Sequence, residues 1–450
     1  MRTFMLAALL AGHGAVMADG VGALGPGDDT DPMPMTGACC LPDGTCEVAS
    51  RRGCETLGGV YQGPGLDCGS TGCVAAETAP PRRAKAGIKG SVLFFSAIEI
   101  RWDAAGGLVQ DTFLSVTNDH PNDVRVLMYL INGDPPLAAD PVTGERAHPG
   151  WNWVDNAFTL TGNQPTYFST LSGQPAAGGL SPMPVLDPGD PPGRPAGDGS
   201  GERVLRGYAV AWAIDVEGAP IRWNHLVGNA TVVRYEGGAA WEYSVLTAPV
   251  VDEAIGHGEP VGAAGQLDLD GLQYAAPPAE LLFNFSATGS IAFSGPKAVS
   301  AATDLVLHPI PADLRQETTG PVRTKATFDI WNMNEVKFSG TDHCVTVWDH
   351  TALASYGVPN HFLLAHLQTD HGKTRVRGVA SVRCDVDADG DGIPEETSVA
   401  ADLTGVIVRR LTLDGGVDVA ATATSATGMG MGAAVIRYDV LGAPPEAHGK

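Results

Sequence analysis

Positive charge is scarce in this chain of 450 residues, which has 28 Lys and Arg side chains against 51 Asp and Glu and a formal net charge of −23. Aromatic residues make up 6% of the chain and charged residues 18%. Because nucleic acid is held mainly by Lys and Arg, this balance excludes an electrostatic nucleic-acid binder as the default. Hydrophobic residues at 44% are typical of a folded chain and not of a disordered one.

Long apolar runs and common catalytic motifs are also missing from the sequence. No stretch reaches the roughly 20 apolar residues that a membrane-spanning helix needs, so we expect no transmembrane segment. Neither a G-x-S-x-G nucleophile elbow nor an H-E-x-x-H metal pair occurs. The sequence therefore does not disclose a biochemical activity. It does predict a cellular compartment, a domain architecture and one ion-binding site.

The first residues have the pattern of a secretory signal. Arg2 supplies a positive start, an apolar stretch follows over residues 4–11, and Val16-Met17-Ala18 is a small-x-small cleavage pattern. We predict a signal peptide over residues 1–18, followed by a linker over residues 19–36. The expected location is secreted, periplasmic or at the cell surface.

Cysteines are concentrated near this end of the chain. Six of the eight fall within 35 residues, and an even, dense set in an exported chain predicts a disulfide module, here over residues 37–73. The alternative is a zinc site, but the paired C-x2-C knuckles that such sites usually use are missing. The spacing leaves the pairing open. The six residues are Cys39, Cys40, Cys46, Cys54, Cys68 and Cys73.

Two stretches resemble known families. The segment 37–46, GACCLPDGTC, with Cys54 and the segment 58–63, resembles a short cysteine-rich module of exported proteins from environmental bacteria. Residues 90–385 resemble an uncharacterised family of exported bacterial β proteins. The resemblance implies export and a β fold, and it implies no catalysis. Its segments are 151–155, 161–167, 207–215, 221–226 and 331–338.

After a linker over residues 74–89, the pattern is that of β-strands. Residues alternate with period two between turn residues, and capped helical patterns are nearly absent. We predict tandem immunoglobulin-like β-sandwiches, the first over residues 90–300 with a long loop at 174–202, the second over residues 301–450. A similarity between the segments around Asn118 and Asn332 suggests a duplication. The predicted strands are 91–102, 111–117, 124–130, 153–161, 208–215, 221–226, 231–235, 327–332, 344–348, 362–368, 374–384 and 404–413.

The strongest chemical motif is an Asp-rich loop at residues 385–396. Alternating carboxylates with Gly between them can aim several oxygens at one hard cation, which predicts calcium. Read from Asp385, the loop matches an EF-hand loop with Gly390 at position six; read from Asp387, it resembles thrombospondin type 3 repeats. A solvated acidic loop is the alternative. The predicted ligands are Asp385, Asp387, Asp389, Asp391, Glu395 and Glu396.

Three other groups are interpreted as structural. Cys344 and Cys384 are expected in strands and joined by an intersheet disulfide. Five histidines within 29 residues match no metal-ligand spacing, and five tryptophans are expected in the core rather than on a sugar-binding platform. The histidines are His343, His350, His361, His366 and His371; the tryptophans are Trp151, Trp153, Trp212, Trp223 and Trp241.

Two function classes remain open. The preferred one is an exported, non-enzymatic protein of the cell envelope or surface that acts by binding or structure, with a calcium-stabilised loop and a glycan or protein of the envelope or extracellular space as its ligand. The alternative is a secreted hydrolase acting on polysaccharide, with paired carboxylates such as Asp155 and Asp215 as acid and base.

Overall fold

A computed structural model describes residues 36–41, 45–57, 60–62, 64–69, 82–144, 148–172, 183–187, 189–236, 238–289, 291–294, 297–315, 321–356, 360–381, 384, 398–413 and 417–440. The chain forms two compact units, residues 1–78 and 79–450. The predicted signal peptide, the linker up to residue 35 and the Asp-rich segment 385–396 lie outside the described residues. Among the described residues, no helix is both long and apolar enough to cross a membrane.

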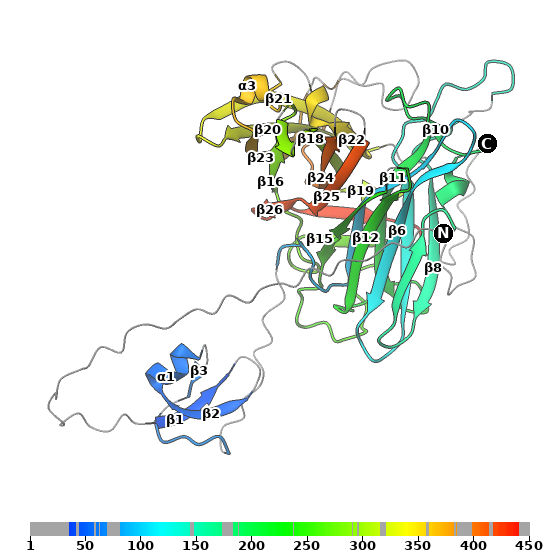
Figure 1. Ribbon diagram of the computed structural model, residues 1–450. Helices are drawn as coiled ribbons and strands as arrows, with labels where there is room; N and C mark the ends of the chain where they lie inside the picture. The colour runs from blue at the N-terminus through cyan, green and yellow to red at the C-terminus, as the bar shows by residue number, and fades with distance from the viewer. Residues whose placement is uncertain are drawn as a thin grey trace, which may run out of the picture. The chain divides into compact units, whose positions relative to one another are not determined.

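The first unit contains a small three-stranded sheet with one short helix (Figure 1). Strand β1 pairs antiparallel with both β2 and β3. The described disulfides are Cys39–Cys54, between β1 and α1, and Cys46–Cys68. Cys40 is also disulfide-bonded, and Cys73 lies outside the described residues. The elements are β1 (Thr36–Cys40), β2 (Cys46–Ser50), α1 (Arg51–Thr56) and β3 (Val60–Tyr61).

The second unit begins with an eleven-stranded antiparallel sheet in which β13, β12, β6, β5, β11, β7 and β8 are successive neighbours. β5 pairs with β6 only around Arg101 and Trp102; the start of β5 pairs with β14 instead, and β6 pairs with β9. The sheet therefore has two arms joined at this corner. Its strands are β4 (Lys85–Ala86), β5 (Val92–Trp102), β6 (Leu108–Asn118), β7 (Val124–Asn132), β8 (Trp153–Leu160), β9 (Pro165–Ser169), β10 (Arg194–Pro195), β11 (Arg203–Ile214), β12 (Leu226–Arg234), β13 (Ala239–Ser244) and β14 (Leu246–Ala248).

The remaining strands form three smaller sheets. Two have five strands each, ordered β21-β20-β23-β16-β26 and β17-β18-β24-β25 with β22 beside β18, and the third is β15-β27-β19. The elements are β15 (Gln266–Leu269), β16 (Glu280–Ser286), β17 (Ile291–Ser294), β18 (Lys297–Pro309), β19 (Ala312–Asp313), β20 (Arg323–Asn332), β21 (Lys337–Thr346), β22 (Asp349–Ala352), β23 (His371–Val379), β24 (Leu403–Leu413), β25 (Val417–Ser425), β26 (Thr427–Met429), β27 (Ala434–Arg437), η2 (Met183–Leu186), η3 (Leu353–Ser355) and α3 (Leu364–Leu367).

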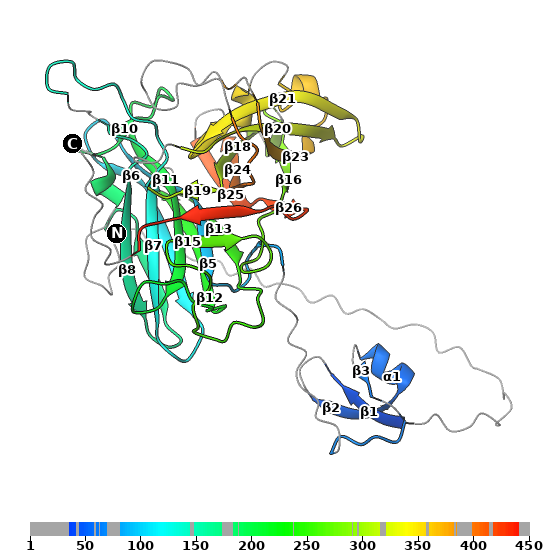
Figure 2. The ribbon, with the colours of Figure 1, turned by 180° about the vertical axis from the view of Figure 1, so that it is seen from behind.

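Two hydrophobic cores hold the second unit together. The first core takes buried side chains from both arms of the large sheet, and the second core lies between the two five-stranded sheets. β18 and β24 contribute to both, because successive side chains of a strand point to opposite faces. Leu305 and Leu307 of β18 lie in the second core, whereas Val306 between them lies in the first. Figures 1 and 2 show β18, β24 and β25 between β20–β23 and the large sheet.

The mainly β prediction is confirmed, and β11 shows why it succeeds. Tyr208, Val210, Trp212 and Ile214 cover one face, the alanines between them cover the other, and all are buried. The two-sided burial expected from this alternation of large and small residues is therefore present. The predicted boundary between residues 300 and 301 falls within β18, and side chains after it, such as Ile310 and Tyr438, belong to the first core.

Several predicted strands differ from the structure. Residues 362–368 contain the short helix α3, because Leu and Ala favour a helix and Gln368 ends it in the left-handed conformation with a φ of 64°. Residues 221–225 form only isolated bridges before β12 begins at Leu226. The strand expected over 374–384 starts earlier, at His371, and ends at Val379, so that Cys384 is not in a strand.

Candidate functional site

The predicted second-unit disulfide is present between Cys344 and Cys384. Cys344 lies on β21, and Cys384 follows β23, two strands away in the same sheet order. The bond therefore spans β20 within one sheet region, and the expectation of an intersheet bond between two strands is wrong. Cys384 is not in a strand because β23 ends at Val379, five residues before it.

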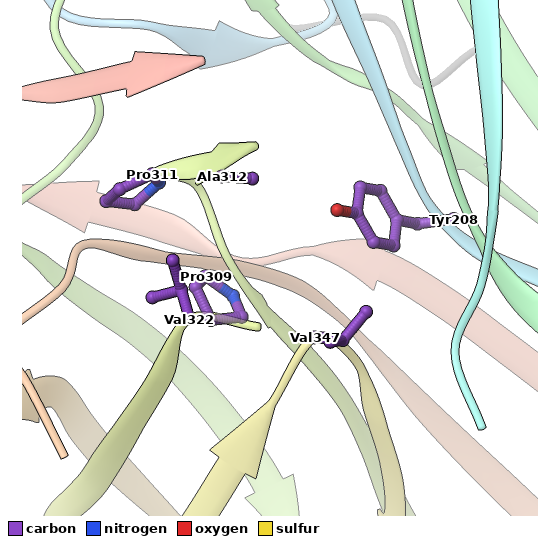
Figure 3. A pocket seen from close by; sticks show the side chains of 6 residues that line it. All are labelled: Tyr208, Pro309, Pro311, Ala312, Val322 and Val347. Atoms are coloured by element: carbon purple, nitrogen blue, oxygen red, sulfur yellow. The ribbon is translucent and has the colours of Figure 1, made fainter. Parts of the chain in front are cut away.

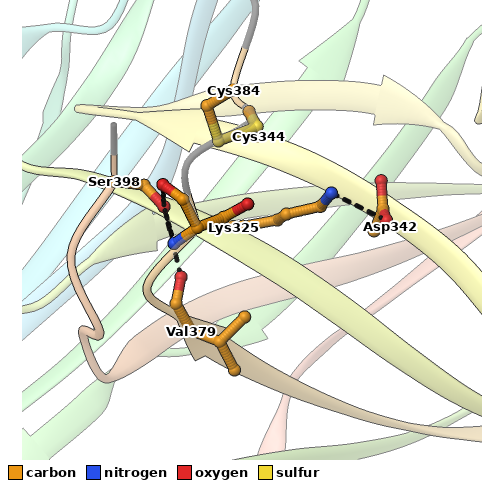
Figure 4. Close-up of a disulfide and its surroundings, with 7 residues drawn as sticks. Lys325, Asp342, Cys344, Val379, Cys384 and Ser398 are labelled. Atoms are coloured by element: carbon orange, nitrogen blue, oxygen red, sulfur yellow. Dashed lines mark hydrogen bonds and ion pairs between the residues drawn. A yellow bond between two sulfur atoms is a disulfide. The ribbon is translucent and has the colours of Figure 1, made fainter. Parts of the chain in front are cut away.

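The predicted calcium ligands lie outside the described residues, but both flanks of their loop are described. Ser381 and Ser398 form an antiparallel bridge, with the Ser398 amide donating to the Ser381 carbonyl at 2.8 Å. The Ser381 amide donates to the Ser398 hydroxyl at 2.9 Å. Figure 4 shows Ser398 close to Val379 and the nearby Cys344–Cys384 bond. Hydrogen bonds thus join the two flanks of the Asp-rich loop, and the disulfide anchors one flank to β21.

The five clustered histidines are distributed among structural contacts. His343 stacks on Tyr356 and lies 3.1 Å from Asp349, and His361 stacks on Phe338. No metal-ligand group in the described part of the chain contains any of the five. The tryptophans are also structural: Trp151, Trp212 and Trp223 are buried, and Trp153 and Trp241 pack against the first core.

The carboxylate pair suggested for a hydrolase is not assembled. Asp155 on β8 stands opposite Tyr129 on β7, which stands opposite Val210 on β11. Asp215 lies five positions beyond Val210, so the Cα atoms of Asp155 and Asp215 are separated by roughly 19 Å, from a rise of ~3.3 Å per residue and a strand spacing of ~4.8 Å. Acid and base carboxyls of glycosidases lie within about 10 Å of each other. Asp155 and Asp215 therefore do not form an acid/base pair.

Three histidines that the sequence analysis did not single out come together at one end of the large sheet. His120 lies in the turn between β6 and β7, His225 immediately precedes β12, and His257 lies in the loop after β14. One ring nitrogen of each lies within 4.8 Å of the others. The ring centroids of His120 and His257 are 4.2 Å apart, and those of His120 and His225 are 4.7 Å apart. We call these residues the three-histidine group.

Hydrogen bonds hold the three segments in place. The Asp119 amide donates to the His225 carbonyl at 3.1 Å, which joins the first two segments. The Gly258 amide donates to the Arg222 carbonyl at 2.9 Å, which brings the loop with His257 beside the segment before β12. Buried Trp223 packs against the rings of His120 and His257, and its indole N–H donates to Asn118 at 3.0 Å.

The surroundings of His120 and His257 favour the neutral form of these two imidazoles. Partial burial and the neighbouring His225 lower the pKa of His120, and burial, His120, His225 and Arg222 lower that of His257. The Asp119 carboxylate accepts from His225 Nδ1 at 3.0 Å and pairs with Lys89. Although burial alone raises its pKa, Lys89 and His225 keep the pKa of Asp119 below its ordinary value.

A second polar cluster bridges the two cores. His350 of β22 has Nδ1 3.0 Å from Glu99 of β5 and Nε2 3.6 Å from Asp304 of β18, which Arg410 of β24 also contacts at 2.5 Å. Burial lowers the pKa of His350, but the bonds to Asp304 and Glu99 outweigh it and raise that pKa to about 9. Burial likewise raises the pKa of Glu99, but Arg101 and His350 hold it well below its usual range. The cluster is an ion-pair network with a charged imidazole at its centre.

The pockets are modest. One, of about 150 Å³, lies among Tyr208, Pro309, Pro311, Ala312, Val322 and Val347, with the Tyr208 hydroxyl facing the other side chains (Figure 3). Small-molecule sites usually measure roughly 300–1,000 Å³, so this one is too small for such a ligand. An open depression of about 700 Å³ is lined by Arg82, Val251, Asp252, Glu253, Ala254, Gly271 and Leu272.

Comparisons with known proteins give no family. No family model matches the chain, and no curated protein matches it. Among solved structures, a Lactobacillus rhamnosus β-glucuronidase aligns over 76% of this chain and 36% of its own, at 10% identity and a TM-score of 0.12. The chain thus spans about a third of that enzyme's length, and a similarity this low carries no argument about fold or function.

Proposed function

We propose that this chain is an exported, non-enzymatic protein of the cell envelope or cell surface that acts by binding or structure. The observation that carries this proposal is the presence of disulfides in both compact units: Cys39–Cys54 and Cys46–Cys68 in the first, Cys344–Cys384 in the second. Disulfides persist in oxidising compartments and are rare in the cytosol. The proposal includes the signal peptide over residues 1–18 and a glycan or protein of the envelope or extracellular space as ligand.

The proposal also keeps a tandem of immunoglobulin-like sandwiches, with β18 spanning the boundary predicted between residues 300 and 301 and contributing to both cores. Two features support it: the sheets are almost entirely antiparallel, and there are two separate hydrophobic cores. Such sandwiches present loops at the ends of the sheets, where binding residues are usually carried. A binding role is therefore compatible with the strand framework and requires no catalytic constellation.

A calcium ion in the Asp-rich loop 385–396 remains part of the proposal. The flanks of the loop support it, because the Ser381–Ser398 bridge holds its two ends together and the Cys344–Cys384 bond anchors one of them to β21. Fixing the ends reduces the conformational entropy that ordering the loop around a cation costs. Clustered carboxylates supply the hard oxygen ligands that calcium prefers.

The test of export uses cells that produce the natural full-length chain. Intact cells are treated with a membrane-impermeant thiol reagent, fractions are separated, and the protein is mapped by non-reducing peptide analysis. We expect the protein outside the cytosol, beginning at Asp19 and with all eight cysteines bonded. Recovery in the cytosol with free thiols would contradict the proposal. A glycan array and a broad hydrolase screen on the same protein then separate binding from the alternative of hydrolysis.

The calcium component has its own test. Limited proteolysis of the full-length protein with and without millimolar calcium should show calcium-dependent protection between Cys384 and Ser398. The matched variant, Asp387→Asn with Asp389→Asn, should lose this protection while keeping the same melting temperature in a chelator. Cleavage that is equally fast with and without calcium would remove calcium from the proposal and leave the export component untouched.

A further inference from the structure

The three-histidine group is composed of ligands suited to a transition metal and not to calcium. Imidazole nitrogen suits zinc, copper, nickel and cobalt, whereas calcium takes oxygen ligands. The Asp-rich loop and the three-histidine group therefore differ in chemistry. The group also differs from the clustered histidines at residues 343–371, because its three members come from three segments that the fold brings together.

Hydrogen bonds to Nδ1 determine which ring nitrogen carries the proton in His225 and in His120. His225 Nδ1 is 3.0 Å from the Asp119 carboxylate, so it carries the proton and leaves Nε2 as the available donor of a lone pair. His120 Nδ1 accepts from the Asn122 amide at 3.1 Å, so the neutral ring carries its proton on Nε2. A metal at His120 therefore either replaces the Asn122 amide at Nδ1 or requires the ring to move its proton away from Nε2. In the described part of the chain, neither Nε2 has a hydrogen-bond partner. A carboxylate bonded to the second nitrogen of a histidine is the usual companion of a metal-binding imidazole.

The packing of the three-histidine group brings its ring nitrogens close together. Three imidazoles lie against one another, and Trp223 lies against them. Unprotonated imidazole is the form that binds metal. The ring nitrogens lie within 4.8 Å of one another, and tetrahedral zinc with bonds of ~2.0–2.1 Å requires roughly 3.4 Å, so small shifts of all three rings close the site.

From this geometry we propose that His120, His225 and His257 bind one divalent transition-metal ion of the zinc class, with Asp119 positioning His225. Three protein ligands leave a fourth position to water or to a ligand from solution, as in open zinc sites. The bound ion fastens the β6–β7 turn, the segment before β12 and the loop after β14 to one another. The inference goes beyond the proposed function and does not depend on the calcium loop.

The experiment uses untagged full-length protein with its disulfides intact, so that neither an affinity tag nor a thiol supplies ligands. After chelator treatment, zinc is titrated by calorimetry, and cobalt is added as a spectroscopic probe. We expect one zinc per chain, a visible cobalt spectrum of a four-coordinate site, and binding that weakens as the imidazoles protonate below about pH 6. An octahedral cobalt spectrum, or no zinc binding, would overturn the proposal.

Matched variants locate the site. His257→Ala should lose at least about 100-fold in zinc affinity, whereas His371→Ala, an exposed histidine on β23, should bind like the natural chain. Asp119→Asn should weaken zinc about 10–100-fold, because the carboxylate orients the ligand. Asp387→Asn with Asp389→Asn should keep zinc, which separates this site from the calcium loop. Unchanged zinc affinity in a His257→Ala protein that melts like the natural chain without metal would refute the assignment.

Discussion

The small cysteine module and the large β unit are stabilised by different means. In the module, the described buried hydrophobic side chains are only Ala38, Cys39 and Cys54, and two of these are themselves cross-linked. The β unit has two hydrophobic cores with many large aliphatic and aromatic side chains. A module this small buries too little apolar surface to offset its conformational entropy, so cross-links must restrain its unfolded state. The comparison indicates that disulfides are essential to the module and only add to the hydrophobic cores in the β unit.

The largest expected effect is the unfolding of the cysteine module, and not of the β unit, when the disulfides are reduced. Treating the folded protein with a thiol reductant should unfold residues 36–69 completely, because removing the disulfides of a small domain often abolishes its folding. The β unit should stay folded, since its cores do not depend on sulfur. Hydrogen exchange followed by mass spectrometry measures both units in one sample. A reduced module that kept slow-exchanging amides would show that its few apolar contacts suffice.

A core truncation should have the next largest effect. Phe362 is fully buried in the second core, with its ring centroid 4.9 Å from that of Phe285 and 5.5 Å from that of Phe328. Phe362→Ala should lower the free energy of unfolding of the β unit by about 3–5 kcal/mol. Denaturant unfolding with the module's disulfides intact measures it. An exposed residue, Leu272→Ala, serves as control; an equal loss in both variants would argue against the core assignment.

Removing the disulfide of the β unit should matter less than removing those of the module. The Cys344–Cys384 bond closes a segment with a sequence separation of 40 residues. Cys344→Ala with Cys384→Ala should cost about 2–4 kcal/mol through the unfolded state and leave the fold intact. Thermal melts and circular dichroism of the double variant provide the measurement. Complete unfolding of this variant would mean that the β unit depends on sulfur as much as the module does.

The smallest expected effect concerns the ion-pair network between the two cores. The folded pKa of His350, about 9, lies above its ordinary value of 6.5, so its contribution is fully present below about pH 6.5 and is lost as pH rises through about 9. The pKa values of Glu99 and Asp304 are lowered and that of Arg101 is raised, so these three groups keep their charges over this range; Arg410 contacts Asp304. His350→Gln should cost about 1–2 kcal/mol at pH 7, and less at pH 10.

Denaturant unfolding at both pH values, with His371→Gln as the exposed control, measures this effect. The control should differ little from the natural chain at either pH. If the cost of His350→Gln were the same at pH 7 and pH 10, the charged imidazole would not be the stabilising species.

Most strands could be predicted from the sequence, because period-two alternation directly reflects burial of one or both faces. β5 and β24 agree with their predicted ranges to within one residue. The exceptions have local causes: at residues 362–368 the apolar run contains helix-forming Leu and Ala, and period alone does not distinguish a short helix from a strand. The turns after Asn118 and Asn332 could also be predicted. Each of these residues ends a strand, and its side-chain oxygen accepts a hydrogen bond from the backbone amide two residues further along. Their duplication stays a hypothesis.

The three-histidine group could not be predicted, because nothing in the sequence connects its members. His120 and His225 are 105 residues apart and His257 is 32 further on, and none stands in a spaced ligand motif. They meet because β6 pairs with β12 and the loop after β14 folds back to residue 222. The histidines at 343–371 drew attention as candidate metal ligands only because they lie close together along the chain. The Asp-rich loop was the opposite case, a local motif that needs no tertiary pairing to be noticed.

The shared strands β18 and β24 limit how this protein can be divided. Each presents alternate side chains to two cores, so a gene fragment ending near residue 300 would encode a large sheet without one of its walls. Such a fragment would lose His308, which stacks on Tyr208, and by exposing that ring it would be prone to aggregate. Recombination between relatives would preserve folding only where β18, β24 and the large sheet are inherited together, which makes residues 79–450 the smallest exchangeable piece.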